Sequence, residues 1–363
     1  MTAGRAFRCA IEAESRGDSM LGTAPPQARV LIVHQPGPWG PRGLVESRCD
    51  PEVAHRIDAA AAKGGMRLQA IRRPGKHEST PLAGGHLVGI ADTRPGAESV
   101  TWWRVDDLAE IAAELEHGWP RRPPVEIDGA PMYLVCAHGR HDACCALRGR
   151  PVAQALHAVR SGRVWETTHL GGDRFAANVL VLPTGHLYGR LPPDTAADFA
   201  GRIDAGEVVP GFLRGRIGLA PIAQAALVFA HQELGIVRRD ALEVTSVQRL
   251  DAEHAQATVV SPNGSFLVDI AIETRPAAQL TCRGPEGVRA RAYRGVSITT
   301  AAPVSAFRCP LCGDANACGS AAGEPECWCC SEKIPAQVTD RIPPYAKDVA
   351  CICRACALGE NSH

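Results

Sequence analysis

The chain lacks the features that mark nucleic-acid-binding and membrane proteins. Its 39 basic and 39 acidic residues cancel, so net charge gives no reason to expect a polyanionic partner. There is no basic stripe with interleaved aromatic residues. No apolar run approaches the roughly 18 residues that span a bilayer, and the first nine residues lack the apolar core of a signal peptide. We therefore expect a cytoplasmic protein without nucleic-acid or membrane partners.

Two catalytic signatures are also missing. No pair of carboxylates stands in a setting that identifies a glycosidase acid and nucleophile. No C-x-x-C motif lies at a strand-to-helix junction, where a thioredoxin-type reductase carries it. Cys144 and Cys145 are adjacent, which is too close for an ordinary dithiol pair. These absences argue against sugar hydrolysis and against disulfide reduction.

Cysteine, by contrast, is abundant. The chain has 15 cysteines, and nine of them lie between Cys309 and Cys356. Because a reducing compartment keeps thiols free, so many cysteines in a cytoplasmic chain indicate metal ligation in preference to a disulfide framework.

Two consecutive segments repeat one order of predicted elements, β-α-β-β-β-α. The first copy has strands near 30–33, 66–72, 86–91 and 100–105, with helices at 50–64 and 106–116. The second has strands near 133–136, 164–168, 178–182 and 186–190, with helices at 146–160 and 195–205. This order predicts an α/β fold with two thioredoxin-like lobes, each a mixed sheet with flanking helices.

The remaining chain divides in the same way. We predict an N-terminal lobe at 1–119, a second lobe at 125–235, a small antiparallel β region at 236–300 and a cysteine-rich metal-binding domain at 305–358. The proline-rich residues 120–124 would link the lobes. In the first lobe, His34 ends the strand that corresponds to the one ending at Cys136. This lobe therefore lacks the ligands and is expected to have a structural or docking role.

The second lobe carries a candidate metal pocket. One strand ends at Cys136, Cys145 follows after a loop, and the next strand leads to His169. Two soft sulfur ligands and an imidazole thus arrive near the tips of neighbouring strands. Taken singly, each residue would be read as a buried cysteine or a core histidine. The glycines Gly171 and Gly172 favour the interpretation as a metal site, because they allow the backbone to approach a ligand closely.

These motifs resemble the sucrase/ferredoxin-like family. The pattern is C-x-H-G-x-x-D-x-x-C, then H-x-G-G-[HD]-R-F-A-x-N, then Y-G-R. The matching residues are Cys136, His138, Gly139, Asp142, Cys145, His169, Gly171, Gly172, Arg174, Phe175, Asn178, Tyr188, Gly189 and Arg190. With similar segments in the first lobe, the resemblance covers most of residues 7 to about 235. It implies a thioredoxin-like ferredoxin.

The resemblance also implies a 2Fe-2S cluster. Eukaryotic members of the family hold it with two cysteines and the two histidines of H-x-x-x-H, which correspond here to Cys136, Cys145, His169 and Asp173. The aspartate departs from the family, and a carboxylate is a harder ligand than imidazole. Three interpretations follow: Asp173 ligates directly, a neighbour such as Cys144 substitutes, or the fourth position is open. We predict Asp173.

The cysteine-rich tail resembles a second family, the cysteine-rich CWC domain, which is presumed to bind metal. The eight residues that fit its pattern are Cys309, Cys312, Cys318, Cys327, Cys329, Cys351, Cys353 and Cys356. Since a closed zinc site uses four ligands, eight thiolates would hold two zinc ions, although iron–sulfur occupancy would also suit four cysteines. With few large apolar side chains, the tail would depend on metal for folding.

The favoured interpretation is a 2Fe-2S electron carrier that exchanges electrons with a partner protein and bears an appended zinc module, in preference to an enzyme with its own substrate. Two alternatives remain. One is a thioredoxin-like thiol redox enzyme, and the other is a zinc-binding adaptor without a cluster.

Overall fold

The predicted repeat of elements is present in the computed structural model, which describes residues 6–75, 85–127, 129–261, 264–301, 305–312, 314–340, 342 and 346–359. The first lobe contains β1 (Arg29–His34), α2 (Pro51–Lys63), β2 (Met66–Arg72), β3 (His86–Asp92), β4 (Ser99–Val105) and α3 (Leu108–Glu116). The second contains β5 (Met132–Cys136), α4 (Ala143–Val159), β6 (Val164–Thr167), β7 (Val179–Leu182), β8 (His186–Tyr188) and α5 (Ala196–Asp204). Strand β9 (Leu213–Arg216) and helix α6 (Pro221–Leu234) follow, and a short α1 (Cys9–Ser15) precedes both lobes.

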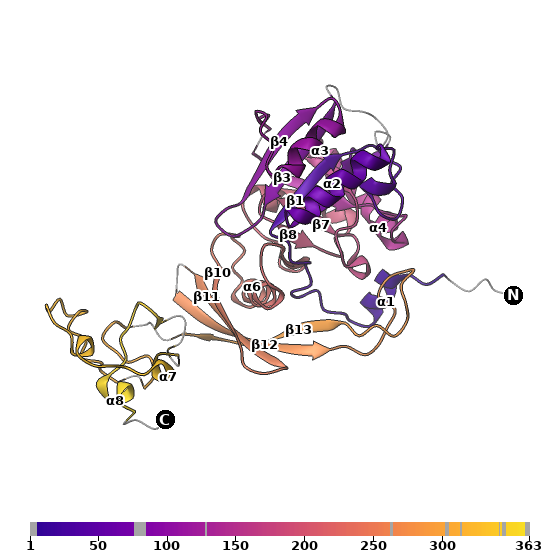
Figure 1. Cartoon of the computed structure of the whole chain (residues 1–363). Coiled ribbons are helices and arrows are strands. Elements are labelled where there is room, and N and C mark those ends of the chain that lie inside the picture. Colours follow the sequence, from indigo (N-terminus) through magenta and orange to yellow (C-terminus); the bar gives the residue numbers. More distant parts are fainter. Residues whose placement is uncertain are drawn as a thin grey trace.

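The two lobes share one continuous sheet. Its strand order is β4-β3-β1-β2-β6-β5-β7-β8-β9. Within each lobe the first two strands are parallel and the others antiparallel. The second lobe therefore repeats the order of the first in reverse along the sheet. The mixed α/β class is confirmed, with both lobes forming a single curled layer (Figure 1).

The lobes join where β2 and β6 pair in antiparallel register, Ile71 opposite Thr167 and Arg72 opposite Glu166. The Arg72 guanidinium contacts a Glu166 carboxylate oxygen at 2.8 and 2.9 Å, and both side chains are almost fully buried, with exposures of 5% and 1%. The guanidinium also lies 4.3 Å from the centre of the Trp39 ring. A buried ion pair is costly to break, because each charge then lies unpaired away from water.

Alternation along the central strands separates the core into layers. Leu31 and Val33 of β1 face the layer under α2 and α3, while Val30 and Ile32 face the opposite side of the sheet. Two helix starts are well formed: Asp50 caps α2 and Asp107 caps α3, each accepting backbone N–H groups of the first turn.

A second, smaller sheet packs on α6. It is antiparallel and contains β10 (Glu243–Arg249), β11 (His254–Ser261), β12 (Gly264–Thr274) and β13 (Arg291–Thr300) in sequential order. Helix α6 lies between this sheet and the large one (Figure 1). The Phe229 ring rests directly over Gly295, where any Cβ would collide with it. The small sheet thus covers the apolar face of α6.

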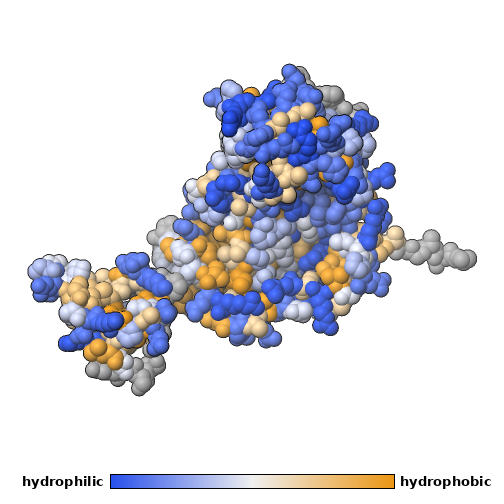
Figure 2. Space-filling view, in the orientation of Figure 1, coloured by the Kyte–Doolittle hydropathy of each residue, from blue (hydrophilic) through white to orange (hydrophobic). Residues whose placement is uncertain are grey.

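The cysteine-rich tail lies beyond the small sheet (Figure 1) and contains the short helices α7 (Ala336–Thr339) and α8 (Arg354–Ala357). Figure 2 shows a largely hydrophilic surface over the first lobe and more apolar residues over the small sheet and tail. Among the described residues, no helix has the length and apolar character to cross a bilayer.

The joint between the lobes yields a stability prediction. The Glu166→Gln substitution keeps the shape of the side chain but removes the negative charge that pairs with the buried Arg72 guanidinium. We expect the free energy of unfolding to fall by about 3–5 kcal/mol, measured by urea unfolding followed through tryptophan fluorescence.

The matched control is Asp240→Asn, which removes the partner of Arg238 in a pair whose side chains are 61% and 65% exposed. This control should leave the unfolding midpoint unchanged, because water screens exposed pairs. Equal unfolding midpoints for the wild type and Glu166→Gln would show that the Arg72–Glu166 pair does not stabilise the contact between the two lobes.

Candidate metal centres

Cys136 and Cys145 meet at the junction between β5 and α4. Cys136 is the last residue of β5, and Cys145 lies in the first turn of α4, after Asp142 caps the helix by accepting the backbone N–H of Cys144. One turn later, Gly149 packs so closely that a Cβ there would lie 1.9 Å from the carbonyl oxygen of Cys136. The helix can sit against the strand end only because position 149 has no side chain.

His169 reaches the same point from the end of β6. Its carbonyl oxygen accepts hydrogen bonds from Arg67 at 2.7 Å and from Gln69 at 3.2 Å, both on β2. Its backbone N–H donates to Nδ1 of His138, whose Nε2 contacts the carbonyl oxygen of Gly40 at 2.8 Å. Since Nδ1 of His138 is the acceptor, the proton of this ring lies on Nε2 and is donated to Gly40. The first lobe therefore holds the backbone of the histidine loop.

The ligand atoms of Cys136, Cys145 and His169 lie within 4.8 Å of one another. Both cysteines are buried, with exposures of 1% and 0%. The structure thus brings together the three residues that the sequence motifs selected.

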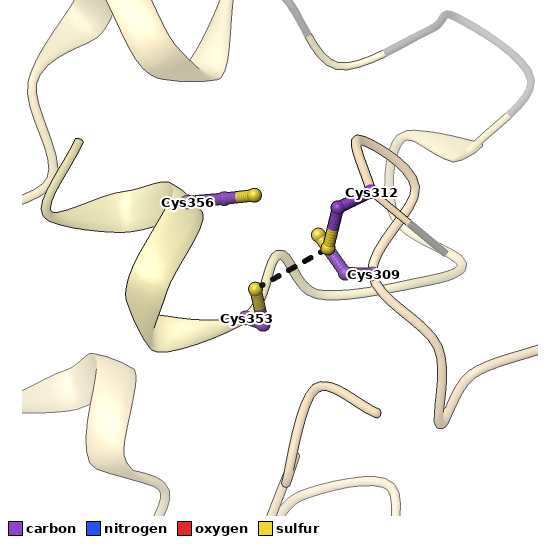
Figure 3. A group of neighbouring side chains, drawn as sticks. All are labelled: Cys309, Cys312, Cys353 and Cys356. Carbon is purple, nitrogen blue, oxygen red and sulfur yellow. Dashed lines mark hydrogen bonds between the residues drawn. The ribbon is translucent and has the colours of Figure 1, made fainter. Parts of the chain in front are cut away.

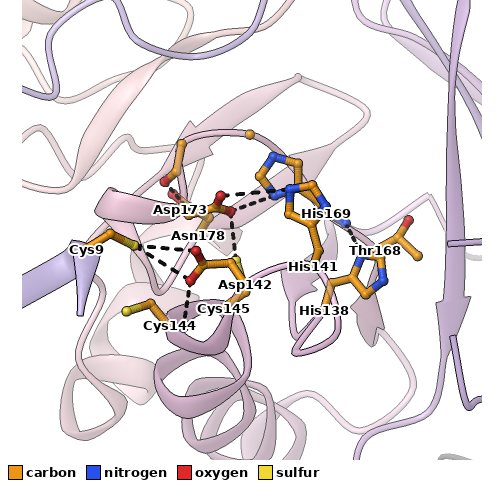
Figure 4. A network of polar contacts seen from close by, with 12 residues as sticks. Cys9, His138, His141, Asp142, Cys144, Cys145, Thr168, His169, Asp173 and Asn178 are labelled. Atoms are coloured by element: carbon orange, nitrogen blue, oxygen red, sulfur yellow. Dashed lines mark hydrogen bonds and ion pairs between the residues drawn. The ribbon is translucent and has the colours of Figure 1, made fainter. Parts of the chain in front are cut away.

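Asp173 lies beside this trio. Its Oδ1 atom is 3.1 Å from Sγ of Cys145 and 2.8 Å from Nδ1 of His169 (Figure 4). When the imidazole is protonated, the carboxylate and Nδ1 form an ion pair.

His141 is a further member of the pocket. Its ring stacks on that of His169 with 3.9 Å between the ring centres, and its Nε2 is 3.8 Å from Oδ2 of Asp173. The sequence motifs did not select His141, because a histidine in a loop gives no directional signal.

The ionisation of the pocket suits a cation. The contact with Cys145 lowers the pKa of Cys136 well below that of a normal thiol, against the effect of burial, and it raises the pKa of Cys145. Burial alone would lower the pKa of His169, but Asp173 and Cys136 outweigh it and raise the pKa to about 9. Burial would likewise raise the pKa of Asp173, yet His169 lowers it. Thiolate and carboxylate therefore sit together with one compensating positive charge.

Arg214 supports the loop that carries Asp173. It is fully buried and donates to the carbonyl oxygen of Gly171 at 2.8 Å and to Oδ1 of Asn178 at 2.7 Å. Its guanidinium lies so close to Gly172 that a Cβ there would be 2.4 Å from a guanidinium nitrogen. No sequence signal identified Arg214. Arg174, within the motif, instead approaches Asp18 at 3.6 Å.

In the tail, the first of two cysteine groups consists of Cys309, Cys312, Cys353 and Cys356, whose sulfur atoms lie within 4.8 Å of one another (Figure 3). The first pair comes from a turn, and the second pair flanks the start of α8. This tetrad could hold a metal ion.

The other four predicted ligands form a second group. The sulfur of Cys318 is 3.4 Å from that of Cys351 and 4.0 Å from that of Cys327, which is 3.3 Å from Cys329. Hydrogen bonds from backbone N–H groups, that of Ser320 first, lower the pKa of Cys327 to about 6. Cys330 lies outside both groups and is exposed. Spacing alone could not show which cysteines belong together.

The sequence model of the sucrase/ferredoxin-like family matches residues 20–215, more than half of the chain. The chain belongs to this family. Residues 309–358 match the cysteine-rich CWC family. The sucrase/ferredoxin-like match includes all four residues predicted to hold the cluster, and the CWC match includes both cysteine groups of the tail.

Partial similarity to two enzymes was also found. A 145-residue stretch is 30% identical to chorismate synthase of Thiobacillus denitrificans, covering 36% of this chain and 37% of that protein. Chorismate synthase of Nitrosomonas eutropha is 27% identical over 145 residues, covering 36% and 34%. The chain thus spans about a third of the length of the curated relatives it matches. No solved structure matches it significantly.

The close approach of α4 to β5 yields a prediction about the pocket. The Gly149→Ala substitution must push the helix away from Cys136, because the added Cβ would overlap its carbonyl oxygen. We expect a loss of about 1–3 kcal/mol of folding free energy and weaker metal retention, measured by chemical unfolding and by metal analysis after dialysis against a chelator.

Gly201→Ala is the matched control, since Gly201 lies within α5 and has open space where a Cβ would stand. There the substitution should stabilise the protein by up to about 1 kcal/mol, because alanine favours a helix. If Gly149→Ala and Gly201→Ala have the same stability and metal retention, the close packing at Gly149 does not determine the geometry of the pocket.

Proposed function

We propose that this sucrase/ferredoxin-like protein is an electron carrier with a 2Fe-2S cluster held by Cys136, Cys145, His169 and Asp173. The observation that carries the proposal is the convergence of two buried sulfurs and an imidazole from three separate segments. The position of Asp173 supports it, because its Oδ1 lies 2.8 Å from Nδ1 of His169 and 3.1 Å from Sγ of Cys145, so that a fourth donor atom stands beside the other three.

Asp173 is the fourth ligand in this proposal. It is 98% buried and already within 3.1 Å of Cys145. Cys144 does not suit the position, because its sulfur lies 3.5 Å from that of Cys282 and outside the trio of Cys136, Cys145 and His169. His141 is the competing residue, and its ring is 37% exposed. We assign it an electrostatic role towards Asp173, because its Nε2 lies 3.8 Å from Oδ2, beyond hydrogen-bond distance.

Mixed ligation has a chemical consequence. A bound cluster supplies one-electron transfer, and fewer thiolates around it give a higher reduction potential than four cysteines would. The chain contributes burial of the thiolates, the fixed backbone of His169 and the buried positive charge of Arg214. Together these features would hold the ligands in place while the charge of the centre changes by one electron.

The contacts also speak against a thiol redox enzyme. Cys145 is fully buried, and its contacts with Cys136 and Asp173 raise its pKa. A nucleophilic cysteine needs an exposed thiolate. The partial similarity to chorismate synthase supplies no substrate here, because the matched stretch leaves out about two thirds of those enzymes.

We further propose that the tail binds two zinc ions, one in each cysteine group. Four sulfurs per group are the number of ligands that a closed tetrahedral zinc site uses. The zinc-only adaptor would retain these ions and lack iron, so metal analysis separates it from the electron carrier.

The cluster can be tested directly. Protein purified without oxygen should contain about two iron and two sulfide per chain, absorb in the visible range and give an electron paramagnetic resonance signal when reduced. Cys136→Ser and Asp173→Asn should each lose most of the iron, because each substitution removes a proposed ligand.

Cys49→Ser is the control, as Cys49 belongs to none of the cysteine groups in the described part of the chain. His141→Ala should keep its iron. Iron-free wild-type protein would refute the electron carrier. Iron loss from His141→Ala but not from Asp173→Asn would show that His141, and not Asp173, is the fourth ligand.

The tail supplies its own prediction. Cys312→Ser should lower the zinc content by one ion per chain, because it removes one ligand of the first group, whereas Cys330→Ser should leave zinc unchanged. Elemental analysis of the full-length protein measures both. Unchanged zinc in Cys312→Ser would show that this tetrad does not bind zinc.

A further inference from the structure

A further group of side chains that could hold a metal ion lies outside the cluster pocket and the tail. Cys9, Asp142, Cys144 and Cys282 place their ligand atoms within 4.8 Å of one another. They come from three distant segments: the start of α1, the start of α4 and the turn before β13. Figure 4 shows Cys9 and Cys144 on one side of Asp142, with His169 and Asp173 on the other. Adjacent residues Cys144 and Cys145 therefore serve two different groups.

The sulfur separations match the edges of a tetrahedral zinc site. The sulfur of Cys282 is 3.5 Å from that of Cys144 and 3.6 Å from that of Cys9. With zinc–sulfur bonds of about 2.3 Å, a regular tetrahedron has sulfur–sulfur edges of about 3.8 Å. The sulfur of Cys9 lies 3.6 and 3.7 Å from the two oxygens of Asp142, and the corresponding sulfur–oxygen edge is about 3.6 Å.

Asp142 is built into this group. Its side chain is fully buried, and its two oxygens accept the backbone N–H groups of Cys144 at 2.8 Å and Cys282 at 2.6 Å. Each oxygen keeps a second lone pair for a metal. The carboxylate therefore fixes the backbone of two cysteines while it faces the third, which is the arrangement of a ligand supported by hydrogen bonds.

The surroundings supply compensating charge. Arg148 on α4 pairs with Glu14 on α1 and so holds the two helices together beside the cysteines. Arg148 interacts electrostatically with Cys9 and Cys144, and Arg174 with Cys9. Three thiolates and one carboxylate around a divalent ion leave two negative charges, which neighbouring arginines offset.

We propose that Cys9, Asp142, Cys144 and Cys282 bind a single tetrahedral divalent ion of the zinc class. Binding replaces the thiol protons, which pass to solvent, and involves no change of oxidation state. The ion would clip the N-terminal helix and the turn before β13 to the start of α4, joining residues 273 positions apart. It would also fix the loop that delivers Cys145.

Zinc and iron counting of the full-length protein, purified without oxygen, tests the proposal. Cys282→Ser should contain one zinc ion fewer per chain than the wild type, with the zinc of the tail retained. Cys282→His should keep the ion, since imidazole is a zinc ligand. Cys49→Ser is the control that removes a cysteine outside the group.

A second measurement uses cadmium in place of zinc. In a cadmium NMR spectrum, cadmium bound by three sulfurs and one oxygen should give a signal separate from that of cadmium in the four-sulfur sites of the tail. The signal of the three-sulfur site should vanish in Cys282→Ser. Equal zinc in Cys282→Ser and wild type, or a disulfide between Cys144 and Cys282 in the anaerobic protein, would overturn the proposal. Because iron and zinc are counted separately, absence of the cluster would leave this test intact.

Discussion

The buried pairing of Arg72 with Glu166 is the constraint on which the rest of the arrangement depends. It lies at the only pairing between the strands of the two lobes within the described sheet, and it fixes the register of β2 against β6. His169 follows three residues after Glu166, and its carbonyl oxygen accepts hydrogen bonds from Arg67 and Gln69 of β2. The first lobe thus holds the backbone of His169 in the second lobe. These contacts run from the side chains of Arg67 and Gln69 to the backbone of His169.

The start of α4 is the second organising feature. Asp142, Cys144 and Cys145 occupy less than one helical turn, and successive residues on a helix point about 100° apart. The sulfur of Cys145 therefore faces Asp173, while that of Cys144 faces Cys282. One capped helix end carries ligand atoms of two groups, so a change at the capping residue Asp142 would alter the geometry of both groups.

Much of the fold followed from local pattern, because capping residues, alternating apolar strands and the repeated order of elements act over short stretches. The trio of Cys136, Cys145 and His169 was also found, since its motif lies within one lobe. The stacking of His141, the support from Arg214 and the grouping of Cys9 with Cys282 were not. Each depends on contacts between segments far apart in the chain, and only the folded backbone specifies them. The division of the tail cysteines into two interleaved groups was hidden for the same reason, as Cys351 and Cys353 belong to different groups.

The reversed strand order has a consequence for the open edge of each lobe. The strands that pair at the joint, β2 and β6, hold the same place in each copy, and they meet antiparallel. A single-lobed chain of this design would expose that strand as a self-complementary edge and would pair with a second copy of itself about a two-fold axis. Joining two such lobes in one polypeptide pairs the two strands within the chain and removes the open edge.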